Sequence, residues 1–289
     1  MRPHTSIWAD IGSVPHELRK LDVDGVSTRV LRAGSGPDLV LLHGTGGHLE
    51  AYSRNIAPLA RHFTVTAYDM VGHGWSDLPD KPYTIDVLTD HLVDLLDVLG
   101  IERAHLSGES LGGWVAAWTA AHYPERVDRL VLNTPGNIAN KPEVMERLKA
   151  STMAAVLDPS DATVRRRVEW LFHDKSLVTD ELVRLRQNVY TRPGYLRAIE
   201  NTLVLQDPAV RCAYAWGPDW TGRITAPTLL LWTSHDPTGG LDEAELLQTW
   251  IPGSRLHIID GAGHWPQWEK PSEFLSAHTE FLSRVGAAR

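Results

Sequence analysis

Cysteine is almost absent from this chain of 289 residues, because Cys212 is the only one. A single cysteine cannot form a disulfide within the chain and supplies no CxxC pair for metal binding or thiol redox chemistry. Long apolar runs are also missing, and no stretch approaches the ~18 residues that a membrane-spanning helix needs. The N-terminus has no basic segment followed by an apolar run, so it contains no evident secretory signal. These absences predict a soluble, cytoplasmic protein that does not enter a membrane.

Basic residues are outnumbered, with 28 Lys and Arg against 36 Asp and Glu, which gives a net charge of −8. This balance argues against a nucleic-acid partner, which requires clustered positive charge. The phosphate-binding patterns GxxxxGK[ST] and GxGxxG at a helix start are absent too. His43 and His48 lie close together, but we expect no carboxylate or cysteine ligand beside them and therefore no metal site. No cofactor is predicted, and the expected partner is a small-molecule substrate.

Strand-like and helix-like segments alternate over most of the sequence. Apolar runs predict strands at residues 25–33, 38–42, 63–69, 103–107, 127–133, 228–232 and 255–260. A helix is predicted at 86–99, with Thr84 as its N-cap and Gly100 just after its end, and others follow residue 110 and span 271–285. Such alternation is typical of an α/β fold with a mostly parallel sheet and helices on both faces.

The alternation stops at about residue 136, where helical patterns at 143–157, 163–172 and 179–189 follow one another without a buried strand. We interpret 136–224 as a helical cap inserted between two strands of one sheet. The core α/β domain then comprises residues 1–135 and 225–289. Ligands bind at the carboxyl ends of the strands in open α/β sheets, so a cap inserted there is expected to cover the site.

The most informative motif is Gly108-Glu109-Ser110-Leu111-Gly112, a G-x-S-x-G pattern with a predicted strand before it and a helix after it. A serine on such a tight turn is held in a strained conformation with its oxygen exposed at the end of the sheet. The flanking glycines allow the strand and the helix to pass closely. Ser110 is therefore the candidate nucleophile. Glu109, just before it, is interpreted as a solvated turn residue.

A serine nucleophile needs a base and a group that orients that base. His264 follows the last predicted strand, on a loop at a strand's C-terminal end, and Asp236 follows the preceding strand. The order Ser110, Asp236, His264 is that of α/β hydrolases. The developing oxyanion needs backbone donors, for which we predict the amides of Leu111 and of Thr45 in the loop 43–48.

These features together resemble the α/β-hydrolase superfamily, over nearly the whole chain, and within it the carbon–carbon bond hydrolases of aromatic meta-cleavage pathways. Three stretches carry the resemblance: Leu41–Gly44 with Tyr52–Asn55, Asp69–Asp77, and Gly263–Glu269 with its His-Trp-x-Gln-Trp-Glu tract. The resemblance implies that Gly44, Arg192 and Trp265 contact the substrate, with Arg192 facing it from the cap. It also implies a homo-oligomer, because relatives often assemble as dimers or larger.

The activity implied is the hydrolysis of 2-hydroxy-6-oxo-dienoic acids, the products of ring-opening dioxygenases, at a carbon–carbon bond. The chain departs from the family at two positions where asparagine is common, since Glu109 precedes the nucleophile and Ala51 stands two residues before Ser53. A carboxylate beside the nucleophile repels an anionic substrate unless it points away or is paired. Two alternatives stay open on this basis: a carboxylesterase or lactonase acting on small apolar esters, and a ligand receptor without catalysis.

Overall fold

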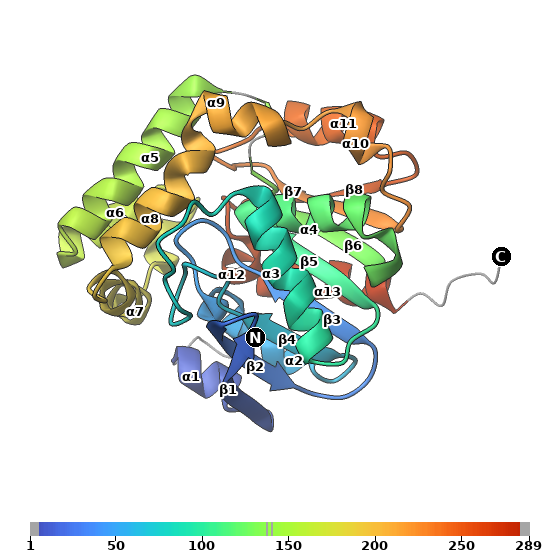
Figure 1. Cartoon of the computed structure of the whole chain (residues 1–289), viewed down its shortest axis with the longest axis horizontal. Coiled ribbons are helices and arrows are strands. Elements are labelled where there is room, and N and C mark those ends of the chain that lie inside the picture. The colour runs from blue at the N-terminus through green and yellow to red at the C-terminus, as the bar shows by residue number, and fades with distance from the viewer. Residues whose placement is uncertain (1–5, 137, 140, 284–289) are drawn as a thin grey trace.

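The core of the molecule is an eight-stranded sheet with the order β1-β2-β4-β3-β5-β6-β7-β8. The computed structural model describes residues 6–136, 138–139 and 141–283 (Figure 1). β1 pairs antiparallel with β2 and β2 with β4, whereas β4, β3, β5, β6, β7 and β8 are parallel. The strands are β1 His16–Val23, β2 Val26–Ala33, β3 Asp38–Leu42, β4 Thr64–Tyr68, β5 Ala104–Glu109, β6 Val127–Asn133, β7 Thr228–Thr233 and β8 Arg255–Ile259.

Helices cover both faces of this sheet because its central strands are apolar on both sides. Along β3, Leu39 and Leu41 belong to the core on one face, and Val40 and Leu42 to the core on the other, as alternating side chains require. The first face packs against α1 Ile7–Ile11, α2 Ser53–Leu59 and α13 Pro271–Leu282, and the second against α3 Ile85–Val98, α4 Leu111–His122 and α11 Leu241–Trp250. The predicted α/β class and the mostly parallel sheet are confirmed.

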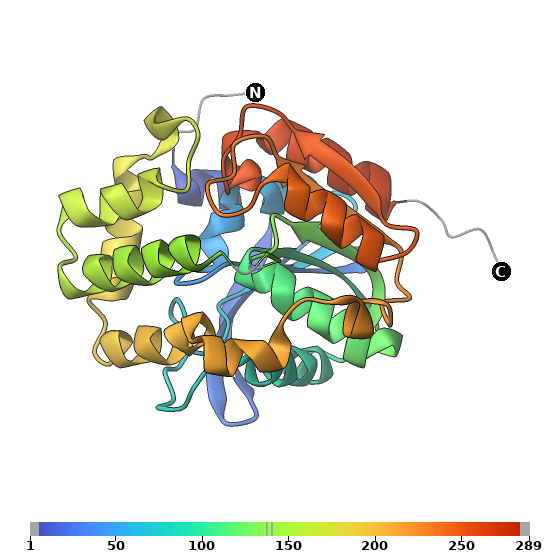
Figure 2. The same ribbon diagram turned by 90° about the horizontal axis from the view of Figure 1, so that it is seen from above.

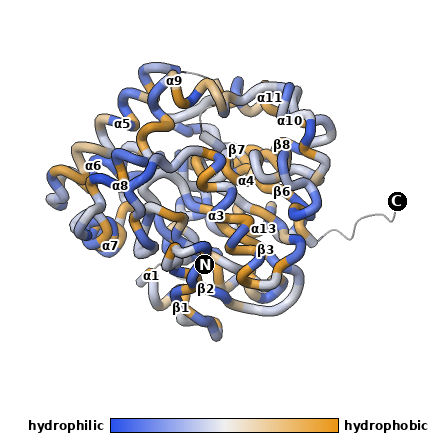
Figure 3. Tube along the Cα trace, in the orientation of Figure 1, coloured by the Kyte–Doolittle hydropathy of each residue, from blue (hydrophilic) through white to orange (hydrophobic). Residues whose placement is uncertain are grey.

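The chain between β6 and β7 forms helices and no strand within the residues that the structure describes. It contains α5 Pro142–Leu157, α6 Asp161–Glu169, α7 Asp180–Tyr190, α8 Tyr195–Leu203, α9 Pro208–Arg211 and α10 Pro218–Thr221. We call α5 to α8 the cap helices, and Figure 2 shows them grouped beside the sheet. In Figure 3 the hydrophobic colours concentrate around the central strands, whereas α5, α6 and α7 mix polar and apolar segments. The exact domain boundaries at residues 135 and 224 stay a prediction.

The predicted elements recur with small changes at their ends. Helix α3 has Thr84 as its N-cap, and Gly100 beyond its end has a positive φ of 67°, the left-handed conformation that favours glycine. The last helix is described to Leu282, and positions 284–289 lie outside the described residues. β1 was not predicted because it is an edge strand whose first five residues are exposed, so it lacks an apolar pattern. Several helices were not predicted either: α1, α2, α8, α9, α10, α11 and α12 Pro266–Glu269. The same holds for the short 3-10 turns Leu49–Tyr52, Pro124–Arg126, Lys175–Leu177, Val204–Gln206 and Cys212–Tyr214.

Candidate active site

Ser110 lies on the turn between β5 and α4, with φ 54° and ψ −117°. Positive φ is rare for a residue with a side chain and marks a strained position. The glycines on either side are sterically required. A Cβ on Gly108 would lie 2.1 Å from the carbonyl oxygen of Gly112, and a Cβ on Gly112 would lie 2.4 Å from that of Leu42. The close passage of strand and helix expected from the motif is therefore present.

Asp236 and His264 meet beside Ser110, from the loops that follow β7 and β8. Nδ1 of His264 lies 3.0 and 2.8 Å from the two carboxylate oxygens of Asp236. Thr238 donates its hydroxyl to Asp236 at 2.8 Å and its backbone amide to the same oxygen at 2.8 Å. Burial acts to lower the pKa of His264, but the negative charges of Asp236 and Glu109 outweigh it, so this pKa is raised above 6.5.

The cap helps to fix the histidine loop. The backbone amide of His264 donates to the carbonyl oxygen of Leu171, just after α6, at 2.7 Å. On the core side, the hydroxyl of Thr134 donates to the carbonyl oxygen of His264 at 3.1 Å. The imidazole is thus held by backbone contacts to both the cap and the core.

Glu109 is buried, with 1% of its surface exposed, and the expectation of a solvated turn residue is wrong. The physical reason is that Glu109 is the last residue of β5 and points into the site, where its Oε1 lies 3.2 Å from Nε2 of His264. Burial raises the pKa of Glu109 to about 6, although the charges of His264 and Arg186 act in the opposite direction. Within the described residues, no hydrogen bond joins Ser110 Oγ to His264.

Gly44 makes room for this carboxylate. A Cβ at Gly44 would lie 2.6 Å from Oε2 of Glu109 and 2.9 Å from Cβ of Ser110. The backbone amide of Gly44 also acts to lower the pKa of Glu109. In this structure Gly44, predicted to contact the substrate, forms the wall of the site beside Ser110 and Glu109.

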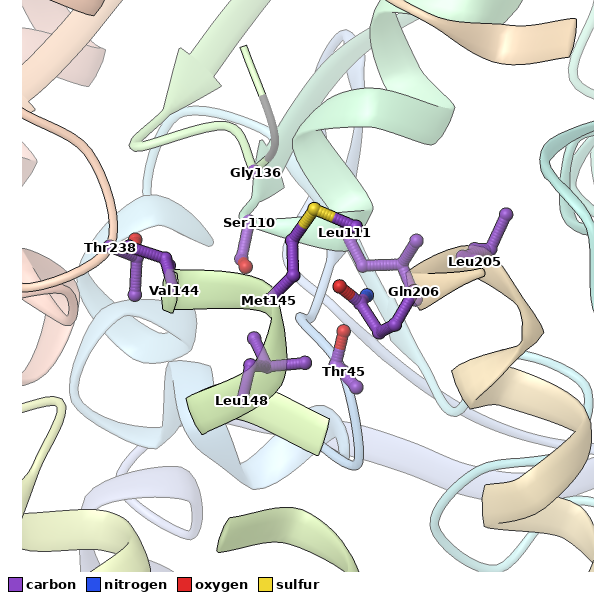
Figure 4. A pocket seen from close by; sticks show the side chains of 10 residues that line it. All are labelled: Thr45, Ser110, Leu111, Gly136, Val144, Met145, Leu148, Leu205, Gln206 and Thr238. Atoms are coloured by element: carbon purple, nitrogen blue, oxygen red, sulfur yellow. The ribbon is translucent and has the colours of Figure 1, made fainter. Parts of the chain in front are cut away.

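A narrow pocket opens beside Ser110 between the core and the cap. It is lined by Thr45, Ser110, Leu111, Gly136, Val144, Met145, Leu148, Leu205, Gln206 and Thr238 (Figure 4). Leu111 is the first residue of α4, so its amide has no acceptor within the helix. In Figure 4 the side chains of Met145 and Leu148 from α5 lie across the space next to Ser110 and Thr45. The cavity volume of about 20 Å³ accommodates about one water molecule.

A second cavity, of about 10 Å³, adjoins the first. Its lining residues are Gly44, Thr45, Glu109, Ser110, Leu148, Arg167, Leu171, His264 and Trp265. The polar side chains that line only this second cavity are Glu109, Arg167 and His264. Trp265 is 2% exposed, and its ring lies 5.6 Å from that of Phe172. Trp265 therefore lines this cavity and packs against the cap, and its contact with a substrate stays a prediction.

Two buried arginines of the cap helices lie close to this cavity, and sequence reasoning missed both. Arg167 on α6 donates from Nε to Thr152 at 3.1 Å, while its Nη1 has no partner among the described residues. Burial lowers the pKa of Arg167 to about 10. Arg186 on α7 donates to the hydroxyl of Tyr190 at 2.9 Å, and its guanidinium lies 4.9 Å from the centre of the Trp265 ring.

A sequence signal for these arginines exists. Arg186 shares the buried face of α7 with Leu182, Val183, Val189 and Tyr190, at helical spacing. An arginine in an apolar helical stripe is rare unless it is paired or functional.

Arg192 lies elsewhere. Its guanidinium donates to the carbonyl oxygen of Gly74 and, at 3.0 Å, to that of Ser76, and it lies 5.4 Å from the centre of the Trp75 ring. Arg192 does not line either cavity beside Ser110. Its observed contacts connect the chain just after α7 to the loop after β4.

His43 and His48 each have a partner within the protein. His43 accepts the amide of Met70 at 3.1 Å through Nε2, and Nδ1 of His48 lies 2.9 Å from Oε2 of Glu50. The expectation that no carboxylate lies beside these histidines is wrong, because Glu50 is folded back onto His48 by the 3-10 turn Leu49–Tyr52. Among the described residues, no group of three or more His, Cys, Asp or Glu side chains is arranged to hold a metal ion. In the same part of the chain, no helix is long and apolar enough to cross a membrane.

Known proteins with a similar sequence or backbone are α/β hydrolases, in agreement with the fold and the site described above. Residues 37–271 match the model of the α/β-hydrolase fold family. The chain is 34% identical to 2-hydroxymuconate semialdehyde hydrolase of Pseudomonas sp. strain CF600, over 95% of this chain and 96% of that enzyme. It is similar to a variant of the meta-cleavage product hydrolase from Pseudomonas fluorescens IP01, with 31% identity, a TM-score of 0.81, and coverage of 91% of this chain and 97% of that one.

A bacterial membrane phospholipase A has a comparable backbone, with a TM-score of 0.83 and 25% identity over 97% of this chain and 90% of that one. Similarity in backbone thus extends to an enzyme whose name denotes a substrate other than those of the two Pseudomonas hydrolases. The matched family model and the level of identity establish that the chain belongs to the α/β-hydrolase fold family.

Proposed function

We propose that this protein hydrolyses a carbon–carbon bond in 2-hydroxy-6-oxo-dienoic acids, the products of meta-cleavage of aromatic rings. The observation that carries the proposal is the buried guanidinium of Arg167, with Nη1 unpaired, in a cavity shared with Ser110 and His264. Arg167 also bonds Thr152 through Nε and lies 5.2 Å from the centre of the Trp170 ring, so Nη1 is the donor without an acceptor. A buried donor of a charged group that lacks an acceptor is costly unless an anion occupies the site for part of the cycle. The names of relatives that are 32–34% identical over most of the chain support the same substrate class.

In the proposed reaction, Ser110, Asp236 and His264 are the catalytic residues. His264 removes a proton from Ser110 or from water, and Asp236 holds the imidazole in the required tautomer. The amides of Leu111 and Thr45 stabilise the oxyanion that forms at the 6-oxo group. The oxygen of water ends on carbon 6, the bond between carbons 5 and 6 breaks, and carbon 5 takes up a proton. The products are a carboxylic acid and a 2-hydroxydienoic acid.

The carbon leaving group departs only if its electrons delocalise, so the dienol must first become the ketone. A guanidinium close to the substrate carboxylate and 2-oxo group favours this change, because it binds both oxygens with charge-assisted hydrogen bonds. Arg167 and Arg186 are the candidates that the geometry supports. Arg192 remains the candidate implied by the family resemblance.

Substrate entry in this proposal requires the cap helices to move. The pocket beside Ser110 accommodates about one water molecule, with its volume of about 20 Å³, whereas a dienoic acid is many times larger. Met145 and Leu148 of α5 line this pocket, so a displacement of α5 enlarges it directly. Motions of such lids occur in microseconds to milliseconds and set the turnover number of many enzymes.

A carboxylesterase or lactonase is the second candidate, and the observation in its favour is Glu109. Its buried carboxyl lies beside the nucleophile, where a negative charge disfavours an anionic substrate and leaves a neutral ester unaffected. Both candidates use the same three catalytic residues.

The test follows the coloured dienolate of a meta-cleavage product after mixing with the purified protein. Rapid loss of colour that yields two acids, and that is abolished in Ser110→Ala, supports the carbon–carbon hydrolase. A folded protein that leaves the dienolate unchanged and hydrolyses simple esters through Ser110 supports the second candidate. Labelling of Ser110 by a serine-directed phosphonate distinguishes both from a receptor without catalysis, which gives no adduct.

A further inference from the structure

Both ring nitrogens of His264 face a carboxylate. Nδ1 lies 2.8 Å from Oδ2 of Asp236, and Nε2 lies 3.2 Å from Oε1 of Glu109. The side chains of His264, Asp236 and Glu109 are at most 3% exposed, so water screens these charges weakly. Nε2 is the nitrogen that must accept the proton of Ser110. The carboxylate that lies against it belongs to Glu109, the residue that precedes the nucleophile.

The surroundings hold Glu109 in this position. The carboxylate fits against Gly44, where a Cβ would come within 2.6 Å of Oε2. Oε2 has no hydrogen-bond partner among the described residues. The charged and titratable groups that act on Glu109 or His264 come from several elements: Tyr52 of the 3-10 turn after β3, Arg167 of α6, Arg186 of α7, and Asp236 of the loop after β7. The arginines belong to cap helices α6 and α7, so the charge around the pair depends on where these helices lie.

We propose that Glu109 is a positioning residue for His264: its carboxylate shares the proton on Nε2 and holds the imidazole away from Ser110 until that proton leaves. The proposal rests on the function proposed above, in which His264 is the base. In the resting ion pair, His264 carries protons on both nitrogens and Glu109 is ionised. Loss of the Nε2 proton to solvent leaves a neutral imidazole, which then accepts the proton of Ser110 Oγ as that oxygen bonds to the substrate carbonyl carbon.

The consequence is a change in the acid limb of the pH profile. An opposite charge within ~4–6 Å favours the charged form of a group and moves its pKa by 1–3. With Glu109 ionised, His264 loses its proton at a higher pH than with a neutral neighbour. The enzyme with Glu109 therefore needs a higher pH to reach full activity.

The experiment compares the pH dependence of kcat/KM for the full-length protein, Glu109→Gln and Glu109→Asn, with a substrate whose turnover is abolished in Ser110→Ala. We expect the acid limb in both Glu109 variants to move to lower pH by one pH unit or more. The matched control is Glu243→Gln, because Glu243 is also a buried glutamate, 2% exposed, but pairs with Lys141. The acid limb of this control is expected to coincide with that of the unaltered protein.

A second measurement does not depend on catalysis. Titration of the imidazole of His264 by NMR, assigned by comparison with His264→Gln, gives its pKa directly. We expect a pKa above 6.5 in the unaltered protein and a lower one in Glu109→Gln. Coinciding acid limbs, or an unchanged pKa of His264 in a folded Glu109→Gln, overturn the proposal. Absence of any Ser110-dependent hydrolysis overturns the proposed function instead and leaves the NMR titration as the test of the pair.

Discussion

The guanidinium group of Arg186 lies 4.9 Å from the centre of the Trp265 ring, which connects cap helix α7 to the loop that carries His264. The same arginine donates to the carbonyl oxygen of Gly46 at 3.3 Å, on the loop that includes Thr45. One buried cation thus contacts the histidine loop and the loop of a proposed oxyanion donor. Arg186 belongs to α7, so a movement of this helix shifts the positive charge relative to both the histidine loop and the loop that includes Thr45.

Replacing the buried arginines is expected to distinguish acidic from neutral substrates. Arg186→Met and Arg167→Met each remove a cation but keep much of the apolar volume. Hydrogen bonds to a charged group contribute about 1.5–3 kcal/mol, so we expect kcat/KM for a dienoic acid to fall by at least about 10-fold and that for a neutral ester to change little. Steady-state kinetics on both substrates checks this. Equal losses on the two substrates would mean that these arginines only support the fold.

Arg192 provides the comparison that tests the family-based prediction. If it contacts the substrate, Arg192→Ala reduces turnover of dienoic acids while neutral esters are spared. Its observed bonds to the carbonyl oxygens of Gly74 and Ser76 favour a different outcome, a similar loss on both substrates through a loosened cap. Kinetics measured beside those of Arg186→Met separates the two roles.

The sequence was sufficient to predict the parallel sheet and the positions of Ser110, Asp236 and His264. Buried strands have the pattern of apolar runs, and each of the three residues lies on the turn or loop that follows such a run. Topology alone therefore brings them to one edge of the sheet. β1 was missed because an edge strand with exposed residues has no such signature.

The orientation of Glu109 was not predictable from its motif. G-x-S-x-G specifies the turn but not whether the residue before the serine meets solvent or protein. That depends on Gly44, more than sixty residues earlier, whose missing side chain leaves space for the carboxylate. Arg186 was not identified for a related reason, and the substrate contact predicted for Arg192 stays a prediction. The positions of cap helices depend on how they pack against the core. Arg186 lies on the buried face of α7 and Arg192 lies in the loop after this helix, and local sequence does not indicate which of the two faces the site.

Asp236→Asn is expected to keep the fold and lose most of kcat. Asp236 accepts hydrogen bonds from Thr238 and faces Nδ1 of His264. An amide there favours the wrong tautomer of the imidazole, and loss of the corresponding aspartate in serine proteases lowers kcat by ~10⁴-fold. We expect a loss of at least ~10³-fold in kcat with a smaller change in KM, together with an unchanged circular dichroism spectrum. Near-normal turnover would point to Glu109 as the group that orients His264.

The buried carboxyl of Glu109 is expected to make the protein less stable above pH 6 than at pH 4.5. Its pKa is raised by burial from 4.5 to about 6, so the folded state retains a proton that the unfolded state loses between these values. The free energy of unfolding therefore falls as the pH rises from 4.5 to 6. Above pH 6 the carboxyl is ionised in both states, and the free energy of unfolding is then lower by about 2 kcal/mol, at about 1.36 kcal/mol per pKa unit.

Glu109→Gln removes this cost while it keeps the shape of the side chain. At pH 8 we expect the variant to be more stable than the unaltered protein by about 1–2 kcal/mol, measured as the shift of the urea unfolding midpoint at constant m-value. At pH 5 the gain should vanish, because pH 5 is about one unit below the pKa of Glu109, so the carboxyl is then mostly protonated and neutral, as the amide of glutamine is. Glu243→Gln is the control with the opposite sign, since it loses a 2.7 Å contact with Lys141 and should be less stable at pH 8. A Glu109→Gln protein that unfolds at lower urea at pH 8 would show that the carboxylate is stabilised by its neighbours more than burial disfavours it.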